Sequence, residues 1–158
     1  MSIQIGDKIP AITLKTPGKD GPKAITTDEI FAGKKVVLFA LPGAFTPGCT
    51  AAHFPGYVVN VDAIKAKGVD TVACLAVNDA FVMGAWGDAQ NAEHILMLAD
   101  GSAHFTNAVG LELDLTEMGL GVRSKRYAMI IEDGIVKTLD IDGADIEKST
   151  AENILTQL

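Results

Sequence analysis

The sequence has only two cysteines and one tryptophan among its 158 residues, and aromatic residues make up 6%. Two cysteines are too few for a disulfide framework, so we expect buried thiols or redox chemistry in a reducing compartment. Basic residues are also scarce, because 13 Lys and Arg stand against 20 Asp and Glu and give a formal net charge of −7. This balance argues against nucleic-acid binding, which requires clustered cations.

Long hydrophobic runs are absent as well. No apolar segment approaches the ~20 residues that span a bilayer, and the first ten residues lack the basic and apolar regions of a secretory signal. We therefore expect a cytoplasmic protein that makes no use of a membrane. The composition, with 48% apolar and 21% charged residues, is typical of a globular protein. No repeat or low-complexity tract interrupts the chain, which predicts one domain over residues 1–158.

Apolar runs and turn signals predict an α/β protein. Residues 35–41 and 70–77 are apolar on both faces, as in buried parallel strands, and Asp133-Gly134 between alternating segments indicates a hairpin. Strands joined by helices, followed by this hairpin and a closing helix, give a thioredoxin-like three-layer α/β/α sandwich with a mixed central sheet. The expected strands are 10–16, 23–26, 35–41, 70–77, 94–99, 124–131 and 135–141; the expected helices start near 46, 79, 103 and 149, the last with Ser149 and Glu152 as a capping box.

Cys49 is expected in the first turn of a helix. Thr46 suits the N-cap and Pro47 the first helical position, so that Cys49 is the third, whereas Pro55 should kink or divide the helix. The unpaired backbone N–H groups and the dipole at a helix start favour an anion, here the thiolate. The alternative is a small buried hydrophobic residue, which is the ordinary role of a free cysteine.

The pattern Pro42-x-x-x-Thr46-x-x-Cys49 resembles the active-site motif of the peroxiredoxins. Residues 41–50 are similar to the atypical type II branch of that family, which includes the mammalian type 5 and plant type II enzymes. Residues 73–86 and 126–129 resemble further blocks of the branch, so the likeness covers essentially the whole chain. The resemblance implies a thioredoxin-like fold and a thiol-dependent peroxidase that reduces hydrogen peroxide and alkyl hydroperoxides without a cofactor or metal.

The resemblance also implies a role for each motif residue. Cys49 would be the nucleophile and become a sulfenic acid, while Thr46 would hold the thiolate and a peroxide oxygen and Pro42 would shield the thiolate from water. Arg126 would stabilise the thiolate and align the peroxide. From spacing alone Arg126 is an ordinary solvated strand arginine, although it alternates in phase with apolar Ala128.

Two interpretations of His53 stay open. It lies four residues after Cys49 and therefore on the same helix face, where it could tune the thiolate, contact the peroxide or bridge to Arg126. It could equally be a structural histidine. The other two histidines have no partner spacing, and no cluster resembles a metal site. Phe45 and Trp86 could line a peroxide pocket, although aromatic residues at such positions are more often part of the core.

Cys74 lies in the middle of an apolar strand and is expected to be structural. Residues 145–150, where the type 5 pattern has its resolving cysteine, contain none. The resemblance to the plant form therefore implies reduction by an external thiol: glutaredoxin, glutathione or thioredoxin. It further implies a homodimer.

Three other functions remain as alternatives. The first is a thiol-disulfide oxidoreductase, which requires a Cys-x-x-Cys motif where this chain has Ala52 three residues after Cys49. The second is a redox sensor, and the third is a binding module with an inert cysteine.

Overall fold

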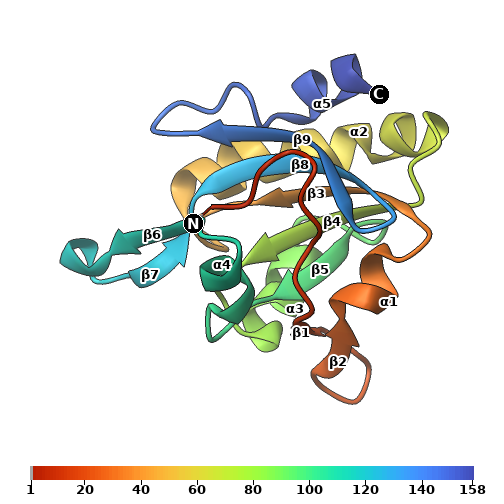
Figure 1. Cartoon of the computed structure of the whole chain (residues 1–158). Coiled ribbons are helices and arrows are strands. Elements are labelled where there is room, and N and C mark those ends of the chain that lie inside the picture. Colours follow the sequence, from red (N-terminus) through yellow and green to blue (C-terminus); the bar gives the residue numbers. More distant parts are fainter. Residues whose placement is uncertain (1) are drawn as a thin grey trace.

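The computed structural model describes residues 2–158 and has a seven-stranded mixed sheet with helices on both faces (Figure 1). The strand order is β2-β1-β5-β4-β3-β8-β9, and the three central strands β5, β4 and β3 are parallel to one another. The strands span Thr13–Thr16 (β1), Lys23–Thr26 (β2), Lys35–Ala40 (β3), Thr71–Ala76 (β4), Leu96–Ala99 (β5), Arg126–Glu132 (β8) and Ile135–Asp142 (β9).

The helices form the outer two layers. The inner faces of α2, α3 and α5 share one apolar cluster with one face of the sheet, and α1 and α4 share a second cluster with the other face. In β3, Val37 and Phe39 belong to the first cluster while Val36 and Leu38 belong to the second, which is the two-residue period of a strand buried on both sides. The helices span Thr27–Phe31 (α1), Phe54–Ala66 (α2), Ala80–Ala89 (α3), His104–Ala108 (α4) and Ala151–Gln157 (α5).

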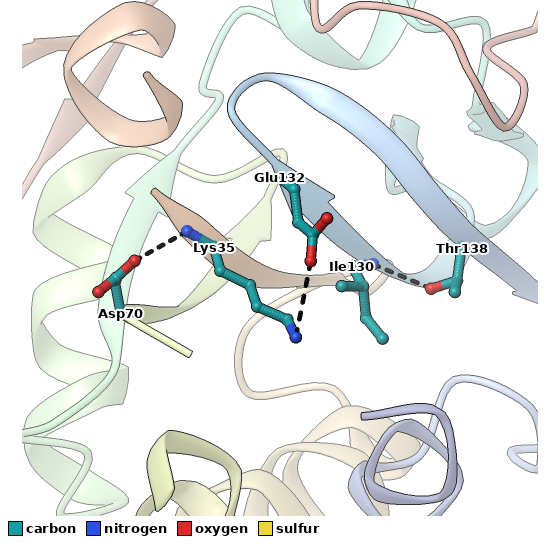
Figure 2. A network of polar contacts seen from close by, with 5 residues as sticks. All are labelled: Lys35, Asp70, Ile130, Glu132 and Thr138. Atoms are coloured by element: carbon teal, nitrogen blue, oxygen red, sulfur yellow. Dashed lines mark hydrogen bonds and ion pairs between the residues drawn. The ribbon is translucent and has the colours of Figure 1, made fainter. Parts of the chain in front are cut away.

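Polar contacts fix the register at the amino end of β3, where Figure 2 shows Lys35 between two neighbouring segments. The Lys35 backbone N–H donates to the Asp70 carboxylate at 2.8 Å, and the Lys35 ammonium lies 3.6 Å from Glu132 on β8. In the β8–β9 hairpin, the register of the strand pairing shifts between Ile130 and Ile131. At this shift the Thr138 hydroxyl accepts the Ile130 N–H at 3.1 Å. These contacts keep the alternation of β8 aligned with that of β3.

The structure confirms the predicted α/β sandwich, including its parallel centre and terminal antiparallel hairpin. It adds a further hairpin, β6 (Glu112–Leu115) and β7 (Gly121–Ser124), joined by the 3₁₀ turn η2 (Thr116–Met118) and projecting from the body of the molecule (Figure 1). This hairpin was not predicted because its strand residues are mostly exposed or half-buried and give no apolar period. Helix α1 was also missed, although Thr26 and Glu29 form a capping box before it.

Several predicted boundaries are wrong, and the strand expected from residue 94 begins at Leu96. The first strand begins at Thr13 and not at residue 10, and β8 begins at Arg126 because Ser124 belongs to β7. The last helix is capped by Thr150, whose hydroxyl accepts from the Asn153 N–H, so the expected Ser149 capping box does not form. The hydroxyl of Ser149 donates to the Asp142 carboxylate instead.

Candidate active site at the start of helix α2

Cys49 lies where the carboxyl end of β3 passes into a helix. Residues 47 and 48 are helical, Cys49–His53 form a π-helical turn (η1), and α2 continues from Phe54, so Cys49 is the third helical residue as predicted. The helix is divided just before Pro55, which lacks the N–H that the α-helical ladder requires. Cys49 is 1% exposed, and its sulfur therefore lies within the protein with little access to water.

Thr46 occupies the predicted N-cap position, but its hydroxyl does not cap the helix. It donates to the carbonyl of Gly43 at 2.6 Å, while the Thr46 carbonyl accepts the Thr50 N–H at 2.9 Å. The hydroxyl closes a tight turn before the helix, in which Phe45 has a left-handed φ of 63°. Because the only hydrogen of the hydroxyl is used, its lone pairs are left as acceptors beside the helix start.

Arg126 reaches this site from β8. It is 9% exposed, its Nη2 donates to Cys49 Sγ at 3.2 Å, and its Nη1 donates to His53 Nδ1 at 2.8 Å. The alternation that placed Arg126 in phase with Ala128 is confirmed, since Ala128 belongs to the cluster beneath α2. A permanent cation at hydrogen-bond distance favours the thiolate over the thiol. The structure therefore brings Arg126 to Cys49 and His53, from which it is separated by 77 and 73 residues in the sequence.

The contacts of His53 define which of its two ring nitrogens carries the proton. An arginine only donates, so His53 Nδ1 is an acceptor and the ring proton is on Nε2, which donates to the Ser149 carbonyl at 3.0 Å. The ring also lies edge-on to Phe39 and Tyr57, at centroid distances of 5.5 and 5.6 Å. Burial lowers the pKa of His53 to about 4, and the Arg126 charge acts in the same direction against the Ser149 contact. His53 is thus a neutral bridge to Arg126.

Two residues that the sequence analysis did not identify lie behind His53. The hydroxyl of Ser149 is 3.2 Å from His53 Nε2 and donates to the Asp142 carboxylate at 2.6 Å. Asp142 also accepts the backbone N–H groups of Glu147, Lys148 and Ser149 at 2.8–3.1 Å. Burial raises the pKa of Asp142, but these hydrogen bonds outweigh it and hold the pKa below its usual value. No local pattern could have found the contact between Ser149 and His53, because the two residues are 96 positions apart in the sequence.

Arg123 and Asn78 hold the loop that contains Pro42. Arg123 Nη1 donates to the Pro42 carbonyl at 3.3 Å, its Nε donates to the Leu120 carbonyl, and the Asn78 side chain accepts the Ala44 N–H at 3.0 Å. Gly43 leaves room for this contact, since a Cβ there would lie 2.6 Å from Arg123 Nη1. Arg123 therefore supports this loop from β7.

The remaining candidates divide between core and surface. Cys74 is fully buried in β4 with a free thiol, and burial raises the pKa of that thiol well above its usual value, with Cys49 adding to the effect. A thiol that stays protonated is a poor nucleophile, which agrees with the structural interpretation. Trp86 belongs to the core and donates to the Thr50 hydroxyl at 3.2 Å, whereas Phe45 is 55% exposed.

Comparison with known proteins gives the family. The Redoxin family model matches residues 4–155. The curated Arabidopsis thaliana protein Peroxiredoxin-2E, chloroplastic, is 45% identical over 99% of this chain and 70% of its own length. The chain belongs to the peroxiredoxins. Members of this family are thiol-dependent peroxidases, so the chain is an oxidoreductase, and its likeness to plant type II members agrees with the branch suggested by residues 41–50.

Solved structures extend the comparison. Reduced Prx3 of Vibrio vulnificus in complex with hydrogen peroxide is 56% identical, with a TM-score of 0.95 over 98% of both chains. A Burkholderia cenocepacia chain, described provisionally as a thioredoxin reductase, is 47% identical with a TM-score of 0.97 over 100% of this chain and 99% of its own. Both likenesses confirm the thioredoxin-like peroxiredoxin fold. Within the part of the chain that the structure describes, no helix is both long and apolar enough to cross a membrane.

Proposed function

We propose that this peroxidase uses Cys49 as its nucleophile. The thiolate attacks the terminal oxygen of a hydroperoxide, the S–O bond forms as the O–O bond breaks, and the leaving oxygen takes a proton to become water or an alcohol. Cys49 is thereby oxidised to the sulfenic acid. Hydrogen peroxide and alkyl hydroperoxides are the substrates, because this step requires only a terminal O–O bond.

The neighbours of Cys49 supply the other parts of the reaction. Arg126, whose Nη2 is 3.2 Å from the sulfur, stabilises the thiolate and the negative charge that develops on the peroxide oxygens. The lone pairs of the Thr46 hydroxyl accept the hydrogen of the incoming hydroperoxide, since its own hydrogen is bound to Gly43. Pro42, whose carbonyl is held by Arg123, limits the access of water to the sulfur. His53 orients Arg126 and in this way contributes to peroxide binding.

The observation that carries this proposal is the Arg126 guanidinium on a buried sulfur at a helix start. The test is turnover of hydrogen peroxide and of an alkyl hydroperoxide by the wild-type protein, Cys49→Ser and Cys74→Ser. Cys49→Ser should abolish turnover of both peroxides, and Cys74→Ser should retain it. Undiminished turnover by Cys49→Ser would contradict the assignment.

We further propose that an external thiol completes the cycle. The sulfenic acid condenses with a first thiol to give a mixed disulfide and water, and a second thiol then releases the Cys49 thiol and a new disulfide. Glutaredoxin with glutathione, or thioredoxin, supplies these thiols. The buried, protonated state of Cys74 supports a cycle with one protein cysteine. If Cys74→Ser folded normally but lost most activity with glutaredoxin and glutathione, the one-cysteine cycle would be wrong.

We also propose an oligomeric state and a location for this protein. A homodimer that meets near the helix start is supported by Phe45, an aromatic side chain that is 55% exposed beside Thr46. Light scattering on Phe45→Ser should show loss of the dimer, whereas Val59→Ser, at an exposed position on α2, should leave it intact.

A cytoplasmic location remains a prediction, since the curated relative named above is chloroplastic. Localisation of the tagged full chain would decide it.

A further inference from the structure

Asp142 lies directly opposite Arg126 in the β8–β9 ladder, where a carboxylate and a guanidinium would normally pair. Instead, Asp142 Oδ2 accepts from the Ser149 hydroxyl, the Ser149 N–H and the Glu147 N–H, and Oδ1 accepts from the Lys148 N–H. Among residues 2–158 the structure has no ion pair between Arg126 and a carboxylate. Residues 147–149 therefore bind the Asp142 carboxylate, and the Arg126 guanidinium donates to Cys49 and His53 instead.

Ser149 acts on the site from its other side as well. Its carbonyl accepts the Nε2 proton of His53 at 3.0 Å and the hydroxyl of Tyr57 at 2.6 Å. Because Nε2 is thereby the donor, Nδ1 is free to accept from Arg126 Nη1. With Nη1 fixed in this way, the planar guanidinium directs Nη2 to Cys49 Sγ. A continuous series of contacts runs from Asp142 through Ser149, His53 and Arg126 to the sulfur.

We propose that Asp142 and Ser149 are positioning residues of the peroxidase site: Ser149 binds the Asp142 carboxylate and presents its carbonyl to His53, which holds Arg126 on the Cys49 sulfur. Neither residue touches the sulfur, and both act through Arg126. This inference rests on the proposed function of Cys49. It requires that weakening the Ser149 contacts lower the reactivity of the Cys49 sulfur even when no peroxide is present.

The test measures alkylation of Cys49 by iodoacetamide across pH, with the modified peptide quantified by mass spectrometry. Ser149→Ala removes the 2.6 Å hydrogen bond to Asp142 and should move the midpoint of the alkylation curve upward by about half a pH unit or more. The matched control is Thr150→Ala, which removes a helix cap next to Ser149 but no contact to His53 or Asp142. Its curve should coincide with that of the wild-type protein.

A double-substitution cycle separates positioning from general damage. In an Arg126→Gln background, adding Ser149→Ala should change the alkylation rate by less than about two-fold, because the group through which Ser149 acts is already gone. The proposal would be overturned if Ser149→Ala changed the alkylation rate equally with and without Arg126. It would also be overturned if a correctly folded Ser149→Ala variant had the same alkylation curve as the wild-type protein. Asp142→Asn provides a second variant and should shift the curve in the same direction as Ser149→Ala.

Peroxide turnover measured on the same variants keeps the two claims apart. If the wild-type protein turns over peroxide and Ser149→Ala matches it in both assays, the positioning role is wrong while the proposed function stands. If no peroxide is turned over by the wild-type protein, the proposed function fails, and the alkylation cycle still decides whether Ser149 acts on Cys49 through Arg126.

Discussion

His53 should make the stability of the fold depend on pH. Its ring is 1% exposed, lies edge-on to two aromatic rings, and accepts from the Arg126 guanidinium at Nδ1. Burial is the main reason that its pKa falls to about 4; the charge of Arg126 lowers it further, while the Ser149 carbonyl and the charge of Asp142 oppose the change. A proton on Nδ1 would place two donors face to face, so the folded protein excludes it.

The size of this pH effect on stability follows from the difference in the pKa of His53 between the folded and the unfolded chain. An unfolded histidine takes up its proton near pH 6.5, whereas His53 in the folded protein remains neutral down to about pH 4. Between these values the unfolded state binds more protons, so the free energy of unfolding falls as the pH falls. At 1.36 kcal/mol per pH unit, the loss due to His53 approaches about 3 kcal/mol at pH 4 and is absent above pH 6.5.

Urea unfolding of the wild-type protein and His53→Gln, near pH 7 and near pH 5, measures this effect. The wild-type protein should lose about 2 kcal/mol more than His53→Gln over this interval, because glutamine does not titrate. His94→Gln is the matched control, since His94 is exposed, and its loss should equal that of the wild-type protein. Equal losses for the wild-type protein and His53→Gln would refute the assignment of His53 as a buried neutral bridge.

Three further substitutions test the hydrogen bonds that hold the Pro42 loop and the packing of the buried core. Arg123→Gln removes the bonds that hold the Pro42 and Leu120 carbonyls and should slow peroxide reduction roughly ten-fold in a competition assay, with little change in the urea midpoint. Tyr127→Phe should raise the free energy of unfolding by ~1 kcal/mol, because the buried Tyr127 hydroxyl has no hydrogen-bond partner among the described residues; a clear loss would show that it is bonded. Ile154→Ala, on the buried face of α5, should lower the free energy of unfolding by about 2–5 kcal/mol in urea.

The sandwich and the position of Cys49 were predictable because their signals are local. The apolar runs that became β3 and β4 are buried on both faces, so only strands in the middle of a covered sheet account for them. Pro47 and Thr46 likewise mark a helix start within a few residues of Cys49. The β6–β7 hairpin gave no such signal, since all of its strand residues except Ser124 are exposed or half-buried.

The support of the site was not predictable in the same way. Spacing indicated which face of its strand Arg126 occupies, but not that β8 lies next to β3 and beneath the start of the helix. Ser149 was assigned to a helix cap because Ser-x-x-Glu fits that motif, and only the fold reveals that Asp142 and His53 bind it instead. The contact with His53 joins residues 96 positions apart, where a single sequence has no periodicity to follow.

The choice of partners around Arg126 has a physical consequence. A guanidinium buried to this extent is most cheaply stabilised by a carboxylate, and Asp142 lies across the ladder to provide one. A carboxylate pair would neutralise the cation and weaken its attraction for sulfur. The neutral His53 nitrogen instead satisfies one N–H and leaves the full charge facing Cys49. The reactivity of Cys49 thus depends on keeping the Asp142 carboxylate bound to residues 147–149 and away from Arg126.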